Sequence, residues 1–150
     1  MLDRFLEKLL DAYHLSLEDY NELTKDISYD DLEDPNDFIG IIEAKERIIK
    51  AIKNKEKIMI YGDYDCDGFS SVSILVNMFK YLNYQNIGYY IPSRYKDGYG
   101  ITEKMVDLIN QKGYSLIITV DNGVAQIDAL NKAKEYGIDV ILTDHHEMIK

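Results

Sequence analysis

From residue 57 onward the chain alternates short apolar runs with amphipathic stretches, and this alternation most constrains the fold. Four strands are predicted, in the runs KIMIYGD, NIGYYIPS, SLIITVDNG and IDVILTDHH. The intervening stretches have apolar residues at helical spacing, and the first of these helices is expected in FSSVSILVNMFKYL, from Phe69. A strand–helix alternation implies right-handed crossovers and a parallel sheet. Nearly continuous apolar strands are typical of a sheet buried on both faces. We therefore predict an α/β fold of the doubly wound, Rossmann-like kind, with a mainly parallel sheet between flanking helices.

A helical segment is predicted before this region. Apolar residues at helical spacing indicate an amphipathic helix in the first dozen residues, and SLEDYNELT opens like a capping box. The acidic stretch YDDLEDPND reads as a loop, and a third helix is expected from about Phe38 to Lys53. We therefore divide the chain into an N-terminal helical extension, residues 1–37, and an α/β domain, residues 38–150.

Composition limits the class of protein and its partners. The chain has 150 residues, of which 46% are hydrophobic, enough for one domain with a core. Its apolar runs are much shorter than the roughly 20 residues that cross a bilayer, so no membrane partner is expected. A single cysteine, Cys66, suits a reducing cytoplasm and reads as a small packing residue.

The net charge of −10 is concentrated near the start of the chain. Residues 1–50 hold 14 acids and 6 bases, whereas residues 51–150 hold 13 acids and 11 bases. Neither part is the basic footprint of a nucleic-acid-binding domain. If the chain contacts a polyanion, metal ions or another domain must supply the positive charge.

Acidic and imidazole side chains gather where three of the predicted strands end. They are Asp63, Asp65 and Asp67 after the first strand, Asp121 after the third, and Asp144, His145 and His146 after the fourth. The carboxyl ends of parallel strands share one edge, where α/β proteins bind ligands. Mixed carboxylate and imidazole ligands suit Mn²⁺, Mg²⁺, Fe²⁺ or Zn²⁺ better than Ca²⁺. The number of ligands favours two ions about 3.5–4 Å apart, an arrangement that activates water for phosphoryl transfer.

Each of these segments also has a simpler interpretation. DYDCDG matches the start of a calcium loop. Such a loop needs a glutamate at its twelfth position and a helix before it, but here the twelfth position counted from Asp63 is Ile74 and a strand precedes the motif. Asp121 before Asn-Gly reads equally well as a turn residue, and either histidine as an ordinary polar residue. The convergence of all three segments favours a metal site.

The segment PSRYKDGYG follows the second predicted strand at the same edge. Arg94 suits bidentate pairing with a phosphate, and Gly98 and Gly100 let backbone amides approach an anion. Tyr99 or Tyr95 suits stacking on a base. A loop with only a surface ion pair explains the segment equally well.

Taken in order, these motifs resemble the DHH phosphoesterase superfamily. The resemblance rests on YGDYDCDG, IPSRYKDGYGI, VDNG and TDHH, and covers about residues 30–148. Within the superfamily the chain is similar to the single-strand-specific 5′→3′ exonucleases. Other branches usually begin the first motif with a histidine where this chain has Tyr61. This difference argues against a family II pyrophosphatase or a small oligoribonuclease.

The resemblance implies a role for each site residue. It makes Asp65, Asp67, Asp121 and His145 ligands of two Mn²⁺ or Mg²⁺ ions, with Asp63 a ligand or close neighbour. Asp144 and His146 would be catalytic, holding the ligands or the charge of the transition state. Arg94, Gly98, Tyr99 and Gly100 would contact the substrate, single-stranded DNA, in DNA repair or recombination.

The resemblance also implies parts that these 150 residues do not contain. Exonucleases of this kind have a fourth motif with another metal-binding aspartate, a DHHA1 subdomain and an OB-type nucleic-acid-binding domain. We therefore expect the chain to be part of an enzyme and to be inactive, or nearly so, by itself.

Two other functions remain open from the sequence. One is a small-nucleotide phosphodiesterase or oligoribonuclease of the same superfamily. The other is a non-catalytic module that docks on repair or replication proteins through the acidic first 50 residues. The intact motifs favour an enzyme.

Overall fold

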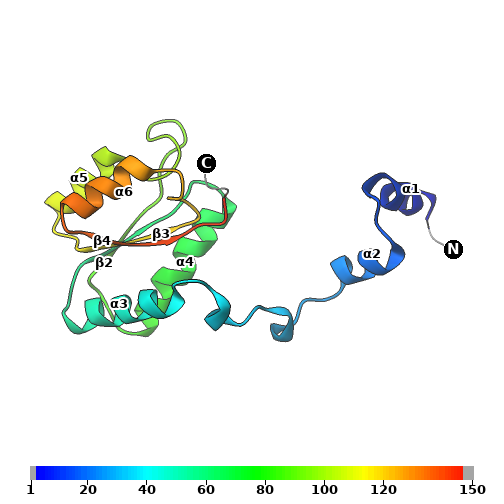
Figure 1. Cartoon of the computed structure of the whole chain (residues 1–150), viewed down its shortest axis with the longest axis horizontal. Coiled ribbons are helices and arrows are strands. Elements are labelled where there is room, and N and C mark those ends of the chain that lie inside the picture. The colour runs from blue at the N-terminus through cyan, green and yellow to red at the C-terminus, as the bar shows by residue number, and fades with distance from the viewer. Residues whose placement is uncertain (1–2, 147–150) are drawn as a thin grey trace. The chain divides into compact units, whose positions relative to one another are not determined.

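The computed structural model of the chain describes residues 3–146. These residues fall into two compact units that divide between Ile41 and Ile42 (Figure 1).

The first unit consists of short helices with polar caps. Its elements are α1 (Arg4–Tyr13), α2 (Leu17–Thr24) and the 3₁₀ turns η1 (Tyr29–Asp31) and η2 (Pro35–Asp37). The predicted capping box at α2 is confirmed: the Asp19 amide donates to Ser16 Oγ at 3.0 Å, and the Ser16 amide donates to Asp19 Oδ2 at 2.8 Å.

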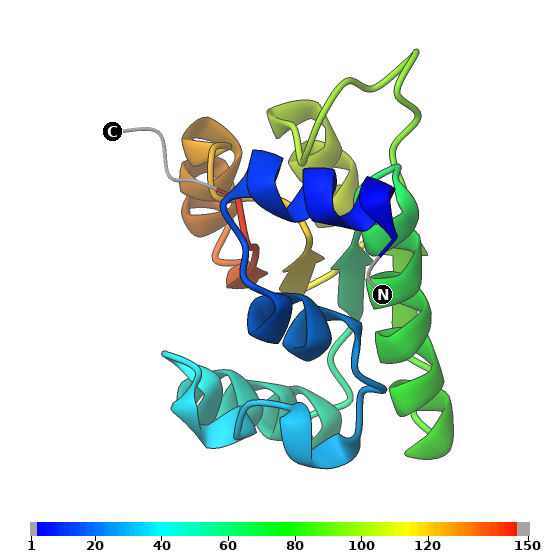
Figure 2. The same ribbon diagram turned by 90° about the vertical axis from the view of Figure 1, so that its right-hand side faces the viewer.

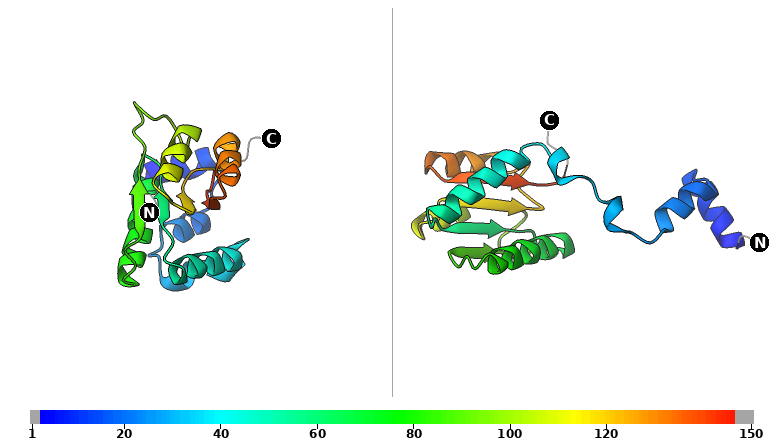
Figure 3. Two further views of the ribbon diagram at one scale, coloured as in Figure 1. Left: turned by 90° about the vertical axis from the view of Figure 1, so that its left-hand side faces the viewer. Right: turned by 90° about the horizontal axis from the view of Figure 1, so that it is seen from below.

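The second unit is built on a four-stranded parallel sheet, which confirms the predicted fold class. Figure 3 shows its strands side by side in the order β2-β1-β3-β4. The strands are β1 (Ile58–Tyr61), β2 (Ile87–Tyr90), β3 (Leu116–Val120) and β4 (Asp139–Thr143).

Four helices cover the two faces of this sheet (Figure 1). They are α3 (Ile41–Lys53), α4 (Cys66–Tyr81), α5 (Glu103–Gln111) and α6 (Ile127–Glu135). On one face Ala51 of α3 and Phe79 of α4 pack against Ile58 and Ile60, and on the other Val106 of α5 and Ala133 of α6 join a second core. β1 and β3 are buried along their whole length, as their apolar sequences predict.

Two helices begin at residues other than those predicted. Helix α3 starts at Ile41 rather than near Phe38, because Pro35–Asp37 forms a 3₁₀ turn and Gly40 takes a left-handed φ of 78°. Helix α4 starts at Cys66 rather than Phe69, because Asp65 caps it by accepting hydrogen bonds from the amides of Asp67 and Gly68. Cys66 is exposed in the first turn, so its interpretation as a packing residue was wrong.

An ion-pair cluster ties α3 to the end of the sheet where β1, β3 and β4 begin. Arg47 of α3 lies 2.6 Å from Glu56, just before β1, and 2.6 Å from Asp139, the first residue of β4. Ser115, just before β3, donates to the same Glu56 oxygen at 2.9 Å. This cluster fixes the sheet at the end opposite the polar motifs.

Among the described helices, none has the length and apolar character needed to cross a membrane.

Candidate metal centre

The polar segments meet at the carboxyl edge of the sheet because three adjacent parallel strands end there. Asp63 follows β1, Asp121 follows β3 directly, and Asp144 follows β4 directly. Asp121 has a left-handed φ of 62°, a conformation that aspartate tolerates better than most residues. Its backbone amide donates to Thr143 at the end of β4, which ties the two strand ends together.

Three carboxylates form the first group of possible ligands. Oxygen atoms of Asp63, Asp65 and Asp121 all lie within 4.8 Å of one another. Asp63 is only 2% exposed and Asp121 only 7%, whereas Asp65 is exposed. One carboxylate oxygen of Asp63 and both of Asp121 are buried without a hydrogen-bond partner in the described part of the chain. Such buried negative groups are costly unless a cation is close by.

Imidazoles complete a second group that shares Asp121. Ligand atoms of Asp121, His145 and His146 also lie within 4.8 Å of one another. His145 Nε2 is 3.0 Å from Asp121 Oδ1, which is within ion-pair distance. Because Asp121 belongs to both groups, it lies where a carboxylate bridging two ions would lie.

Without a cation, the carboxylates disfavour one another's ionisation. Burial raises the pKa of Asp63 and of Asp121, and the nearby Asp65 carboxylate raises the pKa of Asp121 further. Asp65 itself accepts a hydrogen bond from the Gly68 amide, which lowers its pKa. A divalent cation would favour the ionised form of all three.

Asp144 holds His146, a member of the second group, in place. Asp144 Oδ1 is 2.6 Å from His146 Nδ1, and Asp144 Oδ2 accepts from the Val124 amide at 3.0 Å. Burial disfavours the charged form of Asp144, but hydrogen bonds from the Val124 and His146 amides outweigh it and lower its pKa. The same Asp144 hydrogen bond raises the pKa of His146, because it stabilises the imidazolium.

The segment between β2 and α5 reaches this edge from a fourth strand end (Figure 2, light green). Tyr99 places its hydroxyl 3.1 Å from His146 Nδ1, and burial beside Asp144 and Asp63 raises the pKa of Tyr99 to about 12. Gly98 and Gly100 have left-handed φ values of 79° and 70°. A Cβ at Gly100 would lie 2.6 Å from the Gln126 side chain, so only glycine fits there without displacement.

Arg94 lies over an aromatic ring instead of a carboxylate. Its guanidinium carbon is 5.5 Å from the ring centre of Tyr64, the residue between Asp63 and Asp65. Tyr64 in turn makes an edge contact with Tyr99, with 6.3 Å between ring centres. Arg94 and Tyr99 are thus linked through Tyr64.

Among the described residues, Asp67 belongs to neither ligand group. It lies in the first turn of α4, where its amide donates to Asp65 at 3.1 Å and its side chain is exposed. The structure therefore brings together every predicted metal residue except Asp67.

Sequence reasoning missed two residues that hold the site together. Asn122 is fully buried, and its Nδ2 donates to the carbonyls of Tyr61 at 3.1 Å and Val120 at 2.9 Å, joining the ends of β1 and β3. Tyr64 supports Arg94, because its ring lies against the guanidinium group. Asn122 reads as an ordinary turn residue in Asp-Asn-Gly, and Tyr64 is one of 13 tyrosines, so neither stood out.

The donor set fits divalent metal ions. It offers carboxylate oxygens, which suit Mg²⁺ and Mn²⁺, together with imidazole nitrogens, which suit transition metals such as Fe²⁺ and Zn²⁺. The buried oxygens of Asp63 and Asp121 that have no hydrogen-bond partner among the described residues are available to a cation, which would offset the cost of their burial.

Comparison with known proteins agrees with this chemistry. The DHH family, N-terminal domain, matches residues 57–150. The single-stranded-DNA-specific exonuclease RecJ of Bacillus subtilis is 50% identical over 117 residues, which cover 78% of this chain and 15% of that protein. The RecJ exonuclease of Haemophilus influenzae is 34% identical over 141 residues, covering 94% of this chain and 24% of that protein.

Solved structures give the same relationship. A crystal structure of the exonuclease RecJ bound to manganese matches with a TM-score of 0.66 and 33% identity, covering 72% of this chain and 28% of that one. RecJ of Thermus thermophilus in complex with Mn²⁺ matches with a TM-score of 0.64 and 29% identity, covering 76% and 16%. This chain thus spans less than a quarter of the length of the two curated relatives. It belongs to the DHH family, and its relatives within that family include RecJ single-stranded-DNA exonucleases.

Proposed function

We propose that the chain forms the DHH part of a metal-dependent exonuclease that hydrolyses single-stranded DNA from its 5′ end, in DNA repair or recombination. One observation carries the proposal: the carboxylates of Asp63, Asp65 and Asp121 converge within 4.8 Å, with buried oxygens that have no partner among the described residues. RecJ relatives of 50% and 34% identity support the substrate.

In this proposal Asp63, Asp65, Asp121 and His145 hold two Mn²⁺ or Mg²⁺ ions. Asp67 is proposed as a further ligand, because its exposed side chain lies next to Asp65 and can turn toward an ion bound there. The ions would supply a nucleophilic water at neutral pH and charge stabilisation for the phosphoryl oxygens.

The remaining residues act on the DNA through contacts of their own. Asp144 accepts from His146 Nδ1, which leaves Nε2 available to meet the negative charge on the phosphate. Arg94, which lies over the ring of Tyr64, would bind a phosphate of the DNA backbone. Gly98 and Gly100 would let the DNA strand come close to the protein backbone. The Tyr99 hydroxyl lies near the same His146 nitrogen, Nδ1, and helps to orient the ring.

A chimera gives the direct test of this function. The aligned 117 residues of Bacillus subtilis RecJ are replaced by those of this chain, which are 50% identical. With Mn²⁺ we expect the chimera to release nucleotides from the 5′ end of a long single strand, and the 150-residue chain alone to release almost none. Asp121→Asn in the chimera should abolish release, whereas Asp128→Asn, in the first turn of α6, should not.

Substrate preference separates the proposal from its alternatives. Preference of the chimera for dinucleotides over long strands would point to a small-nucleotide phosphodiesterase. A folded chimera that binds Mn²⁺ but hydrolyses neither would favour a non-catalytic module, and robust release by the 150-residue chain would contradict the expected inactivity.

A further inference from the structure

Strand β2 has one side of its backbone without a strand partner in the described part of the chain. In the parallel pairing with β1, the Ile58 amide donates to the Asn86 carbonyl and the Gly62 amide donates to the Tyr90 carbonyl. Because backbone direction alternates along a strand, the N–H and C=O groups of Ile87 and Tyr89 point away from β1. They form a short row of donors and acceptors at the edge of the sheet.

The sequence of this edge has little that prevents strand addition, although β2 is only four residues long. Edges are commonly protected by lysine, proline, a bulge or an inward charge. The strand IGYY contains no charged residue and no proline, and Tyr89 is 63% exposed. It is therefore competent to pair with another extended segment.

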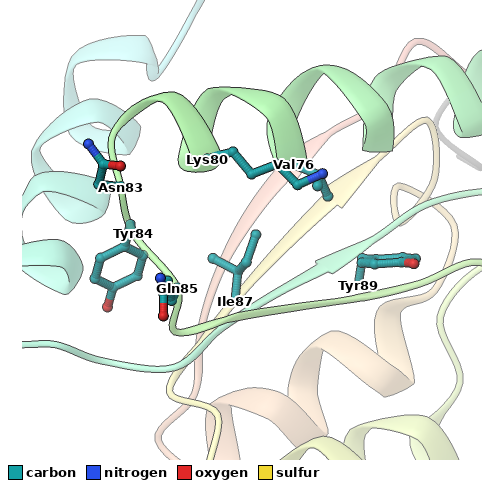
Figure 4. A pocket seen from close by; sticks show the side chains of 7 residues that line it. All are labelled: Val76, Lys80, Asn83, Tyr84, Gln85, Ile87 and Tyr89. Atoms are coloured by element: carbon teal, nitrogen blue, oxygen red, sulfur yellow. The ribbon is translucent and has the colours of Figure 1, made fainter.

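A groove runs along the same edge, between β2 and α4 (Figure 4). Its volume is about 350 Å³, and its lining residues are Val76, Lys80, Asn83, Tyr84, Gln85, Ile87 and Tyr89. Ile87 and Tyr89 supply both the outward backbone groups and part of the lining. A segment paired with β2 would thus direct every second side chain into this groove.

The charge of the groove indicates the kind of segment that fits. The chain carries 27 acidic residues against 17 basic ones, yet the groove is lined by one lysine, Lys80, and no acidic residue. The walls are otherwise apolar or uncharged, and Val76 and Ile87 are the aliphatic residues among them. An occupant with alternating apolar side chains and an acidic residue near Lys80 complements both features.

We propose that the β2 edge and its groove bind an extended, acidic–apolar peptide of a partner protein, which joins the sheet as an additional strand. The backbone bonds to Ile87 and Tyr89 give affinity, and the groove and Lys80 give sequence preference. This site lies on a strand edge and α4, and it uses none of the metal-centre residues.

The test begins with a random octapeptide library displayed on phage and selected on the 150-residue chain. Selected peptides should alternate apolar and polar residues and carry an acidic residue. A synthetic, fluorescein-labelled copy of the strongest peptide then serves as the probe in fluorescence polarisation.

Three variants separate the backbone contribution from the side-chain contribution. Tyr89→Pro removes one outward N–H group but none of the hydrogen bonds between β2 and β1. The probe should therefore bind Tyr89→Pro at least about fivefold more weakly than it binds Tyr89→Ala. Lys80→Glu should weaken binding of the probe about tenfold. The variant should instead prefer a second probe in which lysine replaces the acidic residue. Lys104→Glu, on α5 at the other face, is the matched charge control and should bind as the parent chain does.

Amide hydrogen exchange gives the second readout and confirms folding. In the free chain the Ile87 and Tyr89 amides should exchange fast while those of Gly88 and Tyr90 are protected, and the probe should slow the first pair. The proposal is overturned if no selected peptide responds to Tyr89→Pro, or if the probe leaves the Ile87 and Tyr89 amides unprotected. Self-association of the peptide-free chain that Tyr89→Pro abolishes would instead assign the edge to a second copy, and tighter binding of an oligonucleotide would assign it to nucleic acid.

Discussion

At the scale of single residues, Asp121 has the features expected of a ligand in the proposed metal centre. Its carboxylate is 7% exposed, both of its oxygens lack hydrogen-bond partners among the described residues, and its backbone takes a left-handed φ of 62°. Each feature costs free energy in the metal-free chain. A residue of this kind is expected where function, not folding, selects the side chain.

Asp121→Asn should therefore have opposite effects on stability and on ion binding. Asparagine tolerates the left-handed conformation and removes a buried charge, so the metal-free variant should be more stable by about 1 kcal/mol. Addition of Mn²⁺ should stabilise the parent chain but hardly the variant. Urea unfolding with and without Mn²⁺ measures both effects; a variant that is less stable without metal and equally stabilised by it would refute this role.

Asn122 has the opposite character, because it serves the fold beneath the site. Its two donated hydrogen bonds join the ends of β1 and β3, and it is fully buried. Asn122→Ala should lower the free energy of unfolding by about 2 kcal/mol. In the same urea titration, Asn77→Ala on the exposed side of α4 should change it by less than about 0.5 kcal/mol, and equal losses would show that Asn122 has no special role.

At the scale of elements, the start of α4 sets the geometry of the carboxylates. Asp65 caps the helix, and Gly68 in its first turn lies against the backbone of Asp63. A Cβ at Gly68 would be 2.3 Å from the Asp63 carbonyl oxygen, a distance that no side chain can accept. The close approach of this helix to the end of β1 keeps Asp63 and Asp65 within reach of Asp121.

Gly68→Ala should therefore push α4 away from β1. We expect a loss of about 3 kcal/mol or more in stability, together with weaker Mn²⁺ binding, because backbone cannot move aside as a flexible side chain does. Ser70→Ala, two residues further along α4 and exposed, is the control and should alter neither quantity. Thermal unfolding and calorimetric Mn²⁺ titration would contradict the interpretation if the two variants behaved alike.

The elements also show what a sequence can predict. The strands followed from apolar runs and the start of α2 from its capping box, because both depend on local patterns. The start of α4 was misplaced by three residues because Asp65 was read only as a ligand and not as a helix cap as well. Convergence of Asp63, Asp65 and Asp121 followed from parallel topology, but the contacts of Tyr64 with Arg94 and of Asn122 with two carbonyls depend on tertiary packing that no local pattern encodes.

At the scale of the whole sheet, the two ends differ in how their charged side chains are paired. The carboxyl ends of the strands carry acids without partners among the described residues, while the other end is fixed by Arg47 with Glu56 and Asp139. Burial disfavours the charged form of Glu56, but hydrogen bonds from Arg47, Ser115 and Asn54 outweigh it and lower its pKa below the ordinary 4.5.

This cluster predicts a pH dependence of stability. Because the folded-state pKa of Glu56 is lowered, its stabilisation is present above pH 4.5 and is lost as the pH falls through the folded-state value. Glu56→Gln should cost about 1.5–3 kcal/mol at pH 7, and the difference from the parent chain should shrink below pH 4.5. Urea unfolding at pH 7, 4.5 and 3 checks this, with exposed Glu135→Gln as control; a difference that grows with acid would contradict it.

The central claim is that side chains from three strand ends share metal ions, and NMR with Mn²⁺ tests it most directly. The ion broadens signals of nearby nuclei, so the affected residues identify its position. At substoichiometric Mn²⁺ we expect the amide signals of Asp63, Asp65, Asp121 and His145 of the 150-residue chain to broaden together before any others. Broadening that begins in the acidic stretch 26–37, or that affects one strand end without the others, would contradict a shared centre.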